Sequence, residues 1–405
     1  MRVAYAILGA GPSGLAFANA LRLAGEESFV VLEREAEPGG LCRSHEVDGA
    51  PLDIGGGHFL DVRDREVLDF LFAFMPEDEW TRHVRRSTIR YHGREMGYPF
   101  EANLWRLPVD EQLEFLVSVA EAGCNRGLPR PEGFVEWIVW KLGRRIADEY
   151  MLAYNAKLWG DDLDRLGTYW MDKLPDVSLR DTLQSCLERR PAGRIPAHGE
   201  FYYPRVGGYG ELWRRMGRAL GDRLLLSTPV ESVDAQRRVI NGVIEAGCIV
   251  SSIPWPQWTA FTGIPGEVRA SMRALGHVGI RVDYSPAQPK SDAHWVYVPD
   301  RDVPHHRELN RCNFLPGSRG GWTETNAARG GDVGVFSHVN EYAYPLNTVD
   351  KPAHMRRILE WAASRAIHGL GRWGLWEHMN SDVAVARGMA LARELCPNEA
   401  DATCG

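Results

Sequence analysis

A glycine-rich turn close to the N-terminus limits what this chain can fold into more than any other feature. Gly9, Gly11 and Gly14 have the spacing G-x-G-x-x-G, and they separate an apolar segment over residues 3–8 from a helical apolar pattern over residues 15–21. In a strand–turn–helix unit, the first glycine permits the tight turn, the second lets a pyrophosphate approach the backbone, and the third lets helix and strand pack closely. The free N–H groups at the start of such a helix attract phosphates.

A second apolar segment, over residues 29–32, ends at Glu33, whose carboxylate can accept hydrogen bonds from a ribose hydroxyl. The glycine spacing alone is also compatible with a turn that binds nothing. Because strand, glycines, helix, second strand and acidic residue all follow in the expected order, the sequence predicts a dinucleotide-binding βαβ unit.

Length and composition exclude several other classes of protein. A chain of 405 residues is too long for one ordinary core and predicts two or three domains. Its net charge of −7 argues against a nucleic-acid-binding protein. The seven cysteines include no C-x-x-C pair, so we expect neither a metal site nor a disulfide framework, which fits a reducing cytoplasm. No apolar stretch has the ~20 residues of a membrane span, and the N-terminus lacks a signal cleavage pattern.

The segment after Glu33 favours FAD over NAD as the dinucleotide. It has the pattern Glu-x(5)-Gly-Gly-x-x-Arg-Ser, with Gly39, Gly40 and Arg43 at the fixed positions. This pattern resembles the FAD-binding flavoproteins that include amine oxidases, protoporphyrinogen oxidases and UDP-galactopyranose mutases. The two glycines let the backbone pass close to the cofactor, and the arginine can contact a phosphate.

Further segments resemble the UDP-galactopyranose mutases in particular, in the same order along nearly the whole chain. They are Tyr98-Pro99-Phe100, Tyr154-Asn155-Ala156-Lys157-Leu158-Trp159, the pair Tyr297 and Arg307, and Gly371-Arg372-Trp373-Gly374-Leu375-Trp376. The first two of these segments resemble the eukaryotic branch of the family in particular, and the chain is identified as a divergent member of that family. An ordinary core tryptophan or a surface arginine is the alternative for any one of these residues taken alone.

The resemblance and the apolar periodicity together predict an α/β fold with a Rossmann-like FAD-binding domain, an inserted helical domain and an antiparallel-sheet substrate domain. Helices are expected near residues 63–74 and 109–122, and the arginine- and proline-rich residues 175–200 are expected to form a mobile loop. The expected boundaries are 1–62, 205–256 and 365–395 for the discontinuous FAD-binding domain, 63–170 for the helical insert, and 171–204 and 257–364 for the substrate domain.

The resemblance implies cofactor contacts at both ends of the chain. His58 matches the histidine of a Gly-Gly-His or Gly-Ala-His segment that borders the flavin ring in the mutases. Arg372 is expected beside the FAD, and the backbone of residues 380–383 is expected to face its ribityl and pyrophosphate region. The implied cofactor-binding residues are Gly9, Gly11, Pro12, Ser13, Gly14, Glu33, Arg34, Gly40, Leu41, Gly56, Gly57, His58, Val230, Gly371, Arg372, Asn380 and Val383.

The same resemblance implies a nucleotide-sugar site. Tyr154, Asn155 and Trp159 match positions that hold the uridine, while Arg307 and Tyr344 match positions that contact the diphosphate. An arginine suits that contact because its planar fork pairs with two phosphate oxygens at once. The implied substrate-binding residues are Tyr98, Tyr154, Asn155, Trp159, Tyr297, Arg307, Tyr344 and His378.

The activity that the resemblance implies is a flavin-dependent mutase, which interconverts the pyranose and furanose forms of a nucleotide sugar through a covalent bond between flavin N5 and the sugar, with no net redox change. His58, Arg307 and His378 are the implied catalytic residues. Because the FAD would be active when reduced, an electron donor is an implied partner beside the small-molecule substrate, and a homodimer is expected, with neither nucleic acid nor membrane as a partner.

Two alternatives share the same FAD motifs. One is an FAD-dependent oxidoreductase of the amine or alcohol oxidase type, and the other, which we favour less, is a flavin-bearing protein without catalysis.

The chain departs from the family pattern at three places. His378 stands where the mutases have a phosphate-binding tyrosine, and Glu101 stands where they have an amide side chain. The first of their two diphosphate-binding arginines has no counterpart, and Lys173 and Arg180 are the nearest basic residues. These departures predict a rebuilt anion-binding half of the site, for another nucleotide sugar or for a substrate without a diphosphate.

Overall fold

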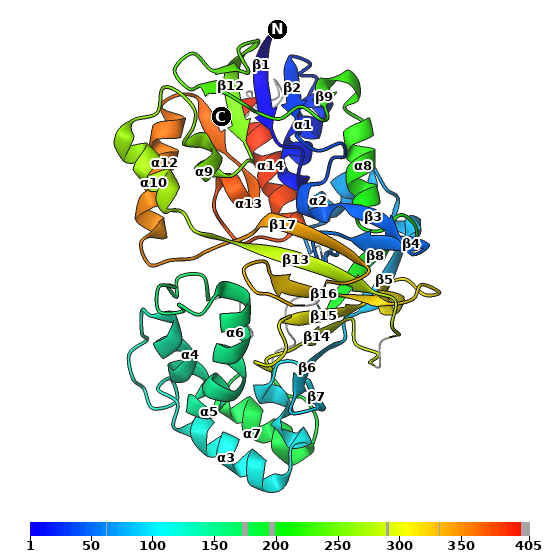
Figure 1. Cartoon of the computed structure of the whole chain (residues 1–405), viewed down its shortest axis with the longest axis vertical. Helices are drawn as coiled ribbons and strands as arrows, with labels where there is room; N and C mark the ends of the chain where they lie inside the picture. Colours follow the sequence, from blue (N-terminus) through cyan, green and yellow to red (C-terminus); the bar gives the residue numbers. More distant parts are fainter. Residues whose placement is uncertain (62, 172–176, 194–198, 289–290, 332, 398–405) are drawn as a thin grey trace.

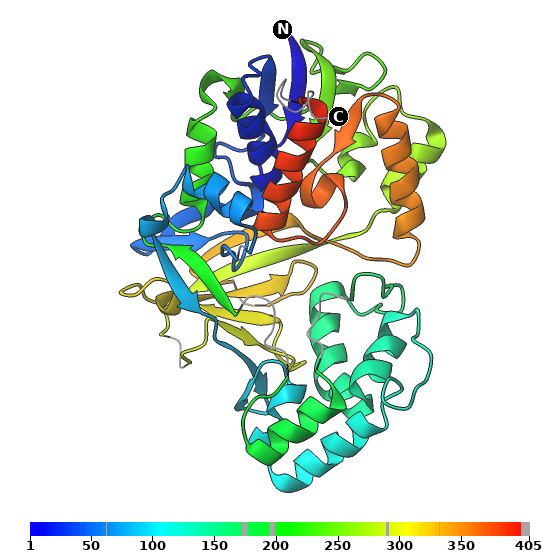
Figure 2. The ribbon, with the colours of Figure 1, turned by 180° about the vertical axis from the view of Figure 1, so that it is seen from behind.

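The molecule is elongated and has three tiers along its longest axis (Figure 1). The computed structural model describes residues 1–61, 63–171, 177–193, 199–288, 291–331 and 333–397. A sheet flanked by helices lies at one end, an antiparallel sheet crosses the middle, and a group of helices forms the other end, as Figure 2 shows from behind. This arrangement confirms the predicted α/β fold class.

The first tier is built on a seven-stranded sheet centred on β1 (Arg2–Leu8). The strand order is β10-β11-β12-β1-β2-β9, with β18 beside β12, and β1 pairs in parallel with both of its neighbours. The other strands are β2 (Phe29–Leu32), β9 (Leu224–Leu225), β10 (Val233–Asp234), β11 (Val239–Ile240), β12 (Ile244–Ser251) and β18 (Ile367–Gly369).

Helices cover both faces of this sheet because successive side chains of a strand point to opposite faces. Ile7 of β1 packs in one core with α1 and α14, while Ala6 and Leu8 pack in another with α9, α10 and α12. Burial on both faces explains why the strand is a continuous apolar run. The helices of this tier are α1 (Pro12–Leu23), α2 (Arg65–Phe72), α8 (Gly210–Arg218), α9 (Trp255–Trp258), α10 (Gly266–Ala274), α12 (Lys351–Ala363), α13 (Gly371–Gly374) and α14 (Ser381–Leu395).

The helices α1 and α14 lie side by side although they come from opposite ends of the chain (Figure 1). At their contact, a Cβ added to Gly388 would lie 2.6 Å from the carbonyl oxygen of Ser13, so the helices approach as closely as the backbone allows. The two N-caps are Gly11 and Asn380, and neither provides a side-chain cap. The first N–H groups of α1 are therefore left for another acceptor, whereas in the first turn of α14 the Asp382 carboxylate accepts from the N–H groups of Asp382 and Val383.

The second tier is a seven-stranded sheet with the order β17-β13-β16-β15-β14-β6-β7. All its pairs are antiparallel except β14 with β6. Two short sheets, β3 with β4 and β5 with β8, lie beside it. The elements are β3 (Ser44–Val47), β4 (Ala50–Asp53), β5 (Trp80–Val84), β6 (Ser87–Tyr91), β7 (Arg94–Gly97), β8 (Glu200–Pro204), β13 (His277–Ser285), β14 (Trp295–Tyr297), β15 (Arg307–Asn310), α11 (Arg311–Phe314), β16 (Gly321–Asn326) and β17 (Phe336–Pro345).

The third tier is helical. The π-helical turn η4 runs from α5 directly into α6, and α7 packs against α3 and the 3-10 helix η3. The elements are η3 (Glu101–Arg106), α3 (Val109–Ala120), α4 (Phe134–Leu142), α5 (Arg144–Ile146), η4 (Ala147–Met151), α6 (Leu152–Trp159) and α7 (Leu179–Glu188).

The structure differs from the expected domain organisation in three respects. The strands β5–β7 lie within the expected helical insert, yet β6 and β7 extend the antiparallel sheet. The helices α10 and α12, expected in the substrate domain, instead bury their apolar faces against the first-tier sheet. Within residues 175–200, expected as a mobile loop, α7 forms, and Ser178 and Asp181 make a capping box at its start; residues 175–176 and 194–198 lie outside the described residues. Within the described residues, no helix has the length and apolarity needed to cross a membrane.

Candidate functional site

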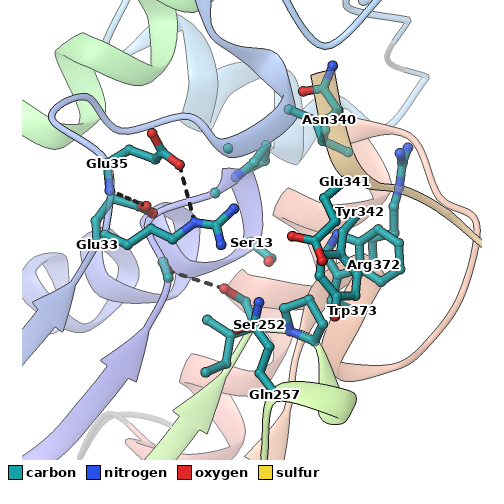
Figure 3. Close-up of a pocket in the computed structure, with 18 of the residues that line it drawn as sticks. Ser13, Glu33, Glu35, Ser252, Gln257, Asn340, Glu341, Tyr342, Arg372 and Trp373 are labelled. Atoms are coloured by element: carbon teal, nitrogen blue, oxygen red, sulfur yellow. Dashed lines mark hydrogen bonds and ion pairs between the residues drawn. The ribbon is translucent and has the colours of Figure 1, made fainter. Parts of the chain in front are cut away.

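A cavity of about 720 Å³ opens between the carboxyl ends of the central first-tier strands and the edge strand β17 of the second tier. Its volume is in the range of small-molecule and cofactor sites, roughly 300–1,000 Å³. In Figure 3, Glu33 and Glu35 lie on one side, Ser13 and Ser252 lie in the middle, and Tyr342, Arg372 and Trp373 lie on the other side. The carboxyl end of a parallel sheet is where α/β proteins place their ligands.

Twelve of the residues expected to bind the cofactor line this cavity. They come from the glycine turn and the start of α1, the end of β2, the segment before β3, the loops after β4 and β9, α13, and the N-cap of α14. They are Gly9, Gly11, Pro12, Ser13, Glu33, Arg34, Gly40, Leu41, His58, Val230, Arg372 and Asn380.

The glycine turn has the geometry that a phosphate site needs. Gly9 has φ +98°, and a Cβ there would lie 2.6 Å from Ser252 Oγ. Gly14 is not in the cavity wall but beneath it, because a Cβ there would lie 2.1 Å from the carbonyl oxygen of Gly9. A Cβ on Gly11, in contrast, would meet no atom within 4 Å. Open space therefore lies beside the backbone where α1 begins.

The other four expected cofactor residues lie outside the cavity lining. Gly371 packs behind it, since a Cβ there would lie 2.1 Å from Ser13 Oγ. Gly56 and Gly57 face a buried carboxylate on β16, described below. Val383 has 41% of its surface exposed and lies in the first turn of α14.

The carboxylate of Glu33 is held in place by the backbone. Its two oxygens accept hydrogen bonds from the N–H groups of Ala10 (2.8 Å) and Glu35 (3.0 Å). Arg43, expected to contact a phosphate, lines the cavity but donates to Glu35 Oε2 (3.1 Å) and to the carbonyl oxygen of Gly40 (3.0 Å). In this structure the Arg43 side chain therefore stabilises the loop that covers the glycine turn.

Sequence reasoning missed the cavity wall contributed by β17. His338, Asn340 and Tyr342 line the cavity, and Asn340 Nδ2 donates to the carbonyl oxygen of Ile54 (2.7 Å). The segment reads as an ordinary strand, and no local motif indicates that a strand of the second sheet reaches the first tier. Ser252, which donates to the carbonyl oxygen of Leu8 (2.9 Å), also lines the cavity without a sequence signal.

His58 lies where the cavity meets the second tier. Its ring stacks on Tyr209 with the centroids 6.3 Å apart, and its buried Nε2 has no hydrogen-bond partner among the described residues. Burial, reinforced by the positive charges of Arg372 and Arg307, lowers the pKa of His58 to about 3. The imidazole is therefore neutral at physiological pH.

This shift predicts a pH dependence of stability. Because the native protein keeps His58 neutral while the unfolded chain takes up a proton below about pH 6.5, acid favours the unfolded state. The stabilising contribution is complete above pH 6.5 and is lost, up to about 5 kcal/mol, as the pH falls towards 3. The free energy of unfolding in urea, measured from pH 7 to pH 4, is expected to fall more steeply for wild type than for His58→Leu. If the free energy of unfolding fell equally steeply with pH in wild type and in His58→Leu, the low pKa of His58 would be contradicted.

The eight residues expected to bind the substrate come together in one cluster between the second and third tiers. Tyr297 contacts Tyr98 (centroids 5.2 Å apart) and Tyr154 (5.6 Å). Tyr344 contacts Trp159 (5.7 Å) and His378 (5.2 Å) and lies 3.4 Å from Arg307 Nη2.

Asn155 joins the cluster through Trp159, whose Nε1 donates to Asn155 Oδ1 (2.9 Å). The Asn155 amide also donates to the carbonyl oxygen of Met151 (2.8 Å), so this side chain orients the tryptophan within α6. Lys157 of the same helix donates to the carbonyl oxygens of Val298 (2.6 Å) and Asp300 (2.8 Å), and burial lowers its pKa to about 8. Its contacts anchor the turn between β14 and β15.

Arg307, at the start of β15, is paired with a residue that the sequence did not single out. The buried Glu324 on β16 accepts hydrogen bonds from Arg307 Nε (2.9 Å) and Nη2. A glutamate in an alternating strand has no distinguishing sequence signal, so only the register of β15 on β16 reveals the pair.

The departures from the family pattern fall in different places. His378 lies against Tyr344 in the cluster. Glu101 lines a second cavity, of about 200 Å³, between η3, α3, α4 and α7. Arg180 lies on α7, and Lys173 is outside the described residues. Among the described residues, no group of three or more His, Cys, Asp or Glu side chains could hold a metal ion.

Comparison with known proteins places this geometry in a family context. Residues 7–74 match the family model for an NAD(P)-binding Rossmann-like domain. The chain is 22% identical to UDP-galactopyranose mutase of Mycoplasma pneumoniae over 415 residues, which cover 96% of each chain. A crystal structure of reduced UDP-galactopyranose mutase matches with a TM-score of 0.86 at 22% identity, covering 98% of this chain and 94% of that one.

A more distant neighbour is wild-type putrescine oxidase bound to putrescine, with a TM-score of 0.61 at 17% identity, covering 98% of this chain and 99% of that one. The fold is therefore shared with that putrescine oxidase, whereas the match to the mutase is better. By sequence and fold along almost its whole length, the chain is similar to the UDP-galactopyranose mutases, as its motifs predicted.

Proposed function

We propose that the large cavity binds FAD. The N-termini of α1 and α14 meet at it, α1 begins without a side-chain cap, and the open space beside Gly11 leaves room for a pyrophosphate. Glu33 lies at the end of β2, where a ribose is bound in this fold. His58 Nε2 has no hydrogen-bond partner in the described part of the chain, so it is available to a polar atom of the flavin ring.

We further propose that the protein is a flavin-dependent mutase, which interconverts pyranose and furanose forms of a nucleotide sugar. One observation carries this proposal: the eight substrate residues implied by the mutase resemblance, far apart in sequence, gather around Arg307 near His58. The likeness to the mutases over 96% of the chain supports the same conclusion.

In this proposal each part of the cluster has a separate role. Tyr154 and Trp159 offer ring surfaces for a nucleoside base. Arg307, with Tyr344, holds the leaving diphosphate and stabilises its charge. His58 stays neutral, so it can present a hydrogen-bond acceptor or donor to the cofactor without adding charge. The reduced flavin would supply the nucleophile towards the sugar, with no net transfer of electrons.

The test compares the reduced and oxidised holoprotein. UDP-galactopyranose is incubated with each, and the two isomers are separated by anion-exchange chromatography while oxygen is monitored with an electrode. We expect conversion to the furanose only after reduction with dithionite. Once excess dithionite has been removed, exposure to air is expected to consume only the oxygen that reoxidises the flavin. The absence of conversion of UDP-, dTDP- and GDP-sugars by reduced, FAD-loaded protein would refute the proposal.

The second candidate is an FAD oxidoreductase of the amine or alcohol oxidase type. The fold likeness to putrescine oxidase and the departures at His378 and Glu101 favour it. Oxidised holoprotein mixed with amines or alcohols would then bleach its flavin and consume oxygen catalytically, which a mutase does not do. A physiological electron donor, a homodimer and a cytoplasmic location stay predictions of the mutase proposal.

A further inference from the structure

Glu324 occupies the junction between the cofactor cavity and the substrate cluster. Its side chain is 1% exposed, and its two carboxylate oxygens have different partners. Oε1 accepts a hydrogen bond from the N–H of Gly57 (2.9 Å), and Oε2 accepts from Arg307 Nε (2.9 Å) and Nη2. Buried His306 lies close as well, with Nε2 3.7 Å from Oε2.

The first partner connects Glu324 to His58. The peptide N–H that Glu324 holds belongs to the residue directly before His58, whose ring lines the cofactor cavity. The approach is close enough to demand a glycine: a Cβ on Gly56 would lie 2.5 Å from Glu324 Oε1, and the φ of Gly56 is +101°. The carboxylate therefore fixes the path of the loop that carries His58.

The second partner connects Glu324 to the diphosphate side. Two nitrogens of the Arg307 guanidinium face Glu324, and one of them also lies 3.4 Å from the hydroxyl of Tyr344. Nη1 has no hydrogen-bond partner among the described residues. A two-nitrogen contact fixes the plane of the guanidinium, so the remaining donors keep one direction, available to an anion.

A buried ion pair often adds little net stability, because the free-energy cost of removing two charges from water often matches the attraction between them. We propose that Glu324 is a positioning residue that aligns His58, on the cofactor side, with Arg307, on the diphosphate side. This inference rests on the proposed function for the role of Arg307, whereas the role towards His58 needs only the bound cofactor.

The test uses FAD-loaded Glu324→Gln and Glu324→Leu, with Glu308→Gln as a matched control. Glu308 lies on the neighbouring strand and forms a similar two-nitrogen pair with Arg90 (2.6 and 2.5 Å), away from the Gly57 peptide. The readouts are the visible absorption spectrum and midpoint potential of the bound flavin, and the dissociation constant of UDP from fluorescence titration.

Glutamine has one carbonyl oxygen and can serve only one of the two partners, so at least one readout is expected to change in Glu324→Gln. Leucine serves neither, so in Glu324→Leu the flavin spectrum is expected to shift and the dissociation constant of UDP to rise about tenfold or more. Glu308→Gln is expected to leave both readouts at the wild-type values. Wild-type readouts in both Glu324 variants would overturn the proposal.

A double-mutant cycle separates positioning from general loss of structure. Adding Glu324→Leu to Arg307→Ala is expected to change UDP binding less than about twofold, because the effect acts through the missing arginine, and still to shift the flavin spectrum. Additive losses of UDP affinity would overturn the proposal. If wild type binds no UDP, the proposed function fails, and the flavin spectrum of the Glu324 variants alone decides whether Glu324 positions the His58 loop.

Discussion

Replacing Gly11 by valine is expected to yield a folded protein that does not retain FAD. The backbone of Gly11 has φ −73° and ψ 178°, which a β-branched residue adopts without strain, and a Cβ there meets nothing within 4 Å. The added methyl groups would occupy the space from which a pyrophosphate reaches the first N–H groups of α1. Losing two charge-assisted hydrogen bonds costs about 3–6 kcal/mol, or roughly a hundred- to ten-thousandfold in affinity.

The measurement is the ratio of flavin to protein after gel filtration, together with the melting temperature of the apoproteins. Gly266→Val is the matched control, because a Cβ on Gly266 also meets nothing within 4 Å but lies at the start of α10, outside the cavity. We expect this control to be yellow and Gly11→Val to be colourless, with apoprotein melting temperatures close to wild type. A yellow Gly11→Val protein would mean that the pyrophosphate does not lie at this turn.

Replacing Arg307 by lysine is expected to weaken UDP binding by about 10- to 100-fold while leaving the flavin bound. Lysine keeps a positive charge beside Glu324, so the buried carboxylate is not left unpaired. It lacks the planar fork, however, and cannot contact Glu324 with two nitrogens and still offer a fixed donor to a diphosphate. The loss of one charge-assisted hydrogen bond, about 1.5–3 kcal/mol, sets the expected size of the effect.

The dissociation constants of UDP and of uridine distinguish the diphosphate contact from the base contact. Arg307→Lys should affect UDP and spare uridine, because Tyr154 and Trp159 are unchanged. Arg90→Lys, in the neighbouring pair with Glu308, is the control and should affect neither. Equal weakening of UDP and uridine by Arg307→Lys would place the diphosphate elsewhere.

The parts of the site that could be predicted from sequence are those encoded locally. The glycine turn and Glu33 lie within one βαβ unit, where spacing along the chain determines position in space. Both line the same cavity, as expected for such a unit. The resemblance also identified residues far apart in sequence, such as Tyr98 and Tyr297, which the fold brings into contact.

The parts that could not be predicted depend on contacts between tiers. Asn340 reaches the cavity only because β17 is the edge strand next to the first tier. Glu324 becomes a junction only through the register of β15 on β16. Likewise, the apolar faces of α10 and α12 are compatible with either sheet, and periodicity does not say which one they cover.

The close contact between α1 and α14 has a consequence for biogenesis. Translation makes α1 long before α14, because most of the sequence lies between them, so the two helices that begin at this cavity can pack together only after α14 has been made. If the cavity binds FAD as proposed, a nascent chain that still lacks α14 offers only one of the two helix N-termini. Full affinity for the flavin is therefore expected only after α14 has been synthesised and has packed against α1.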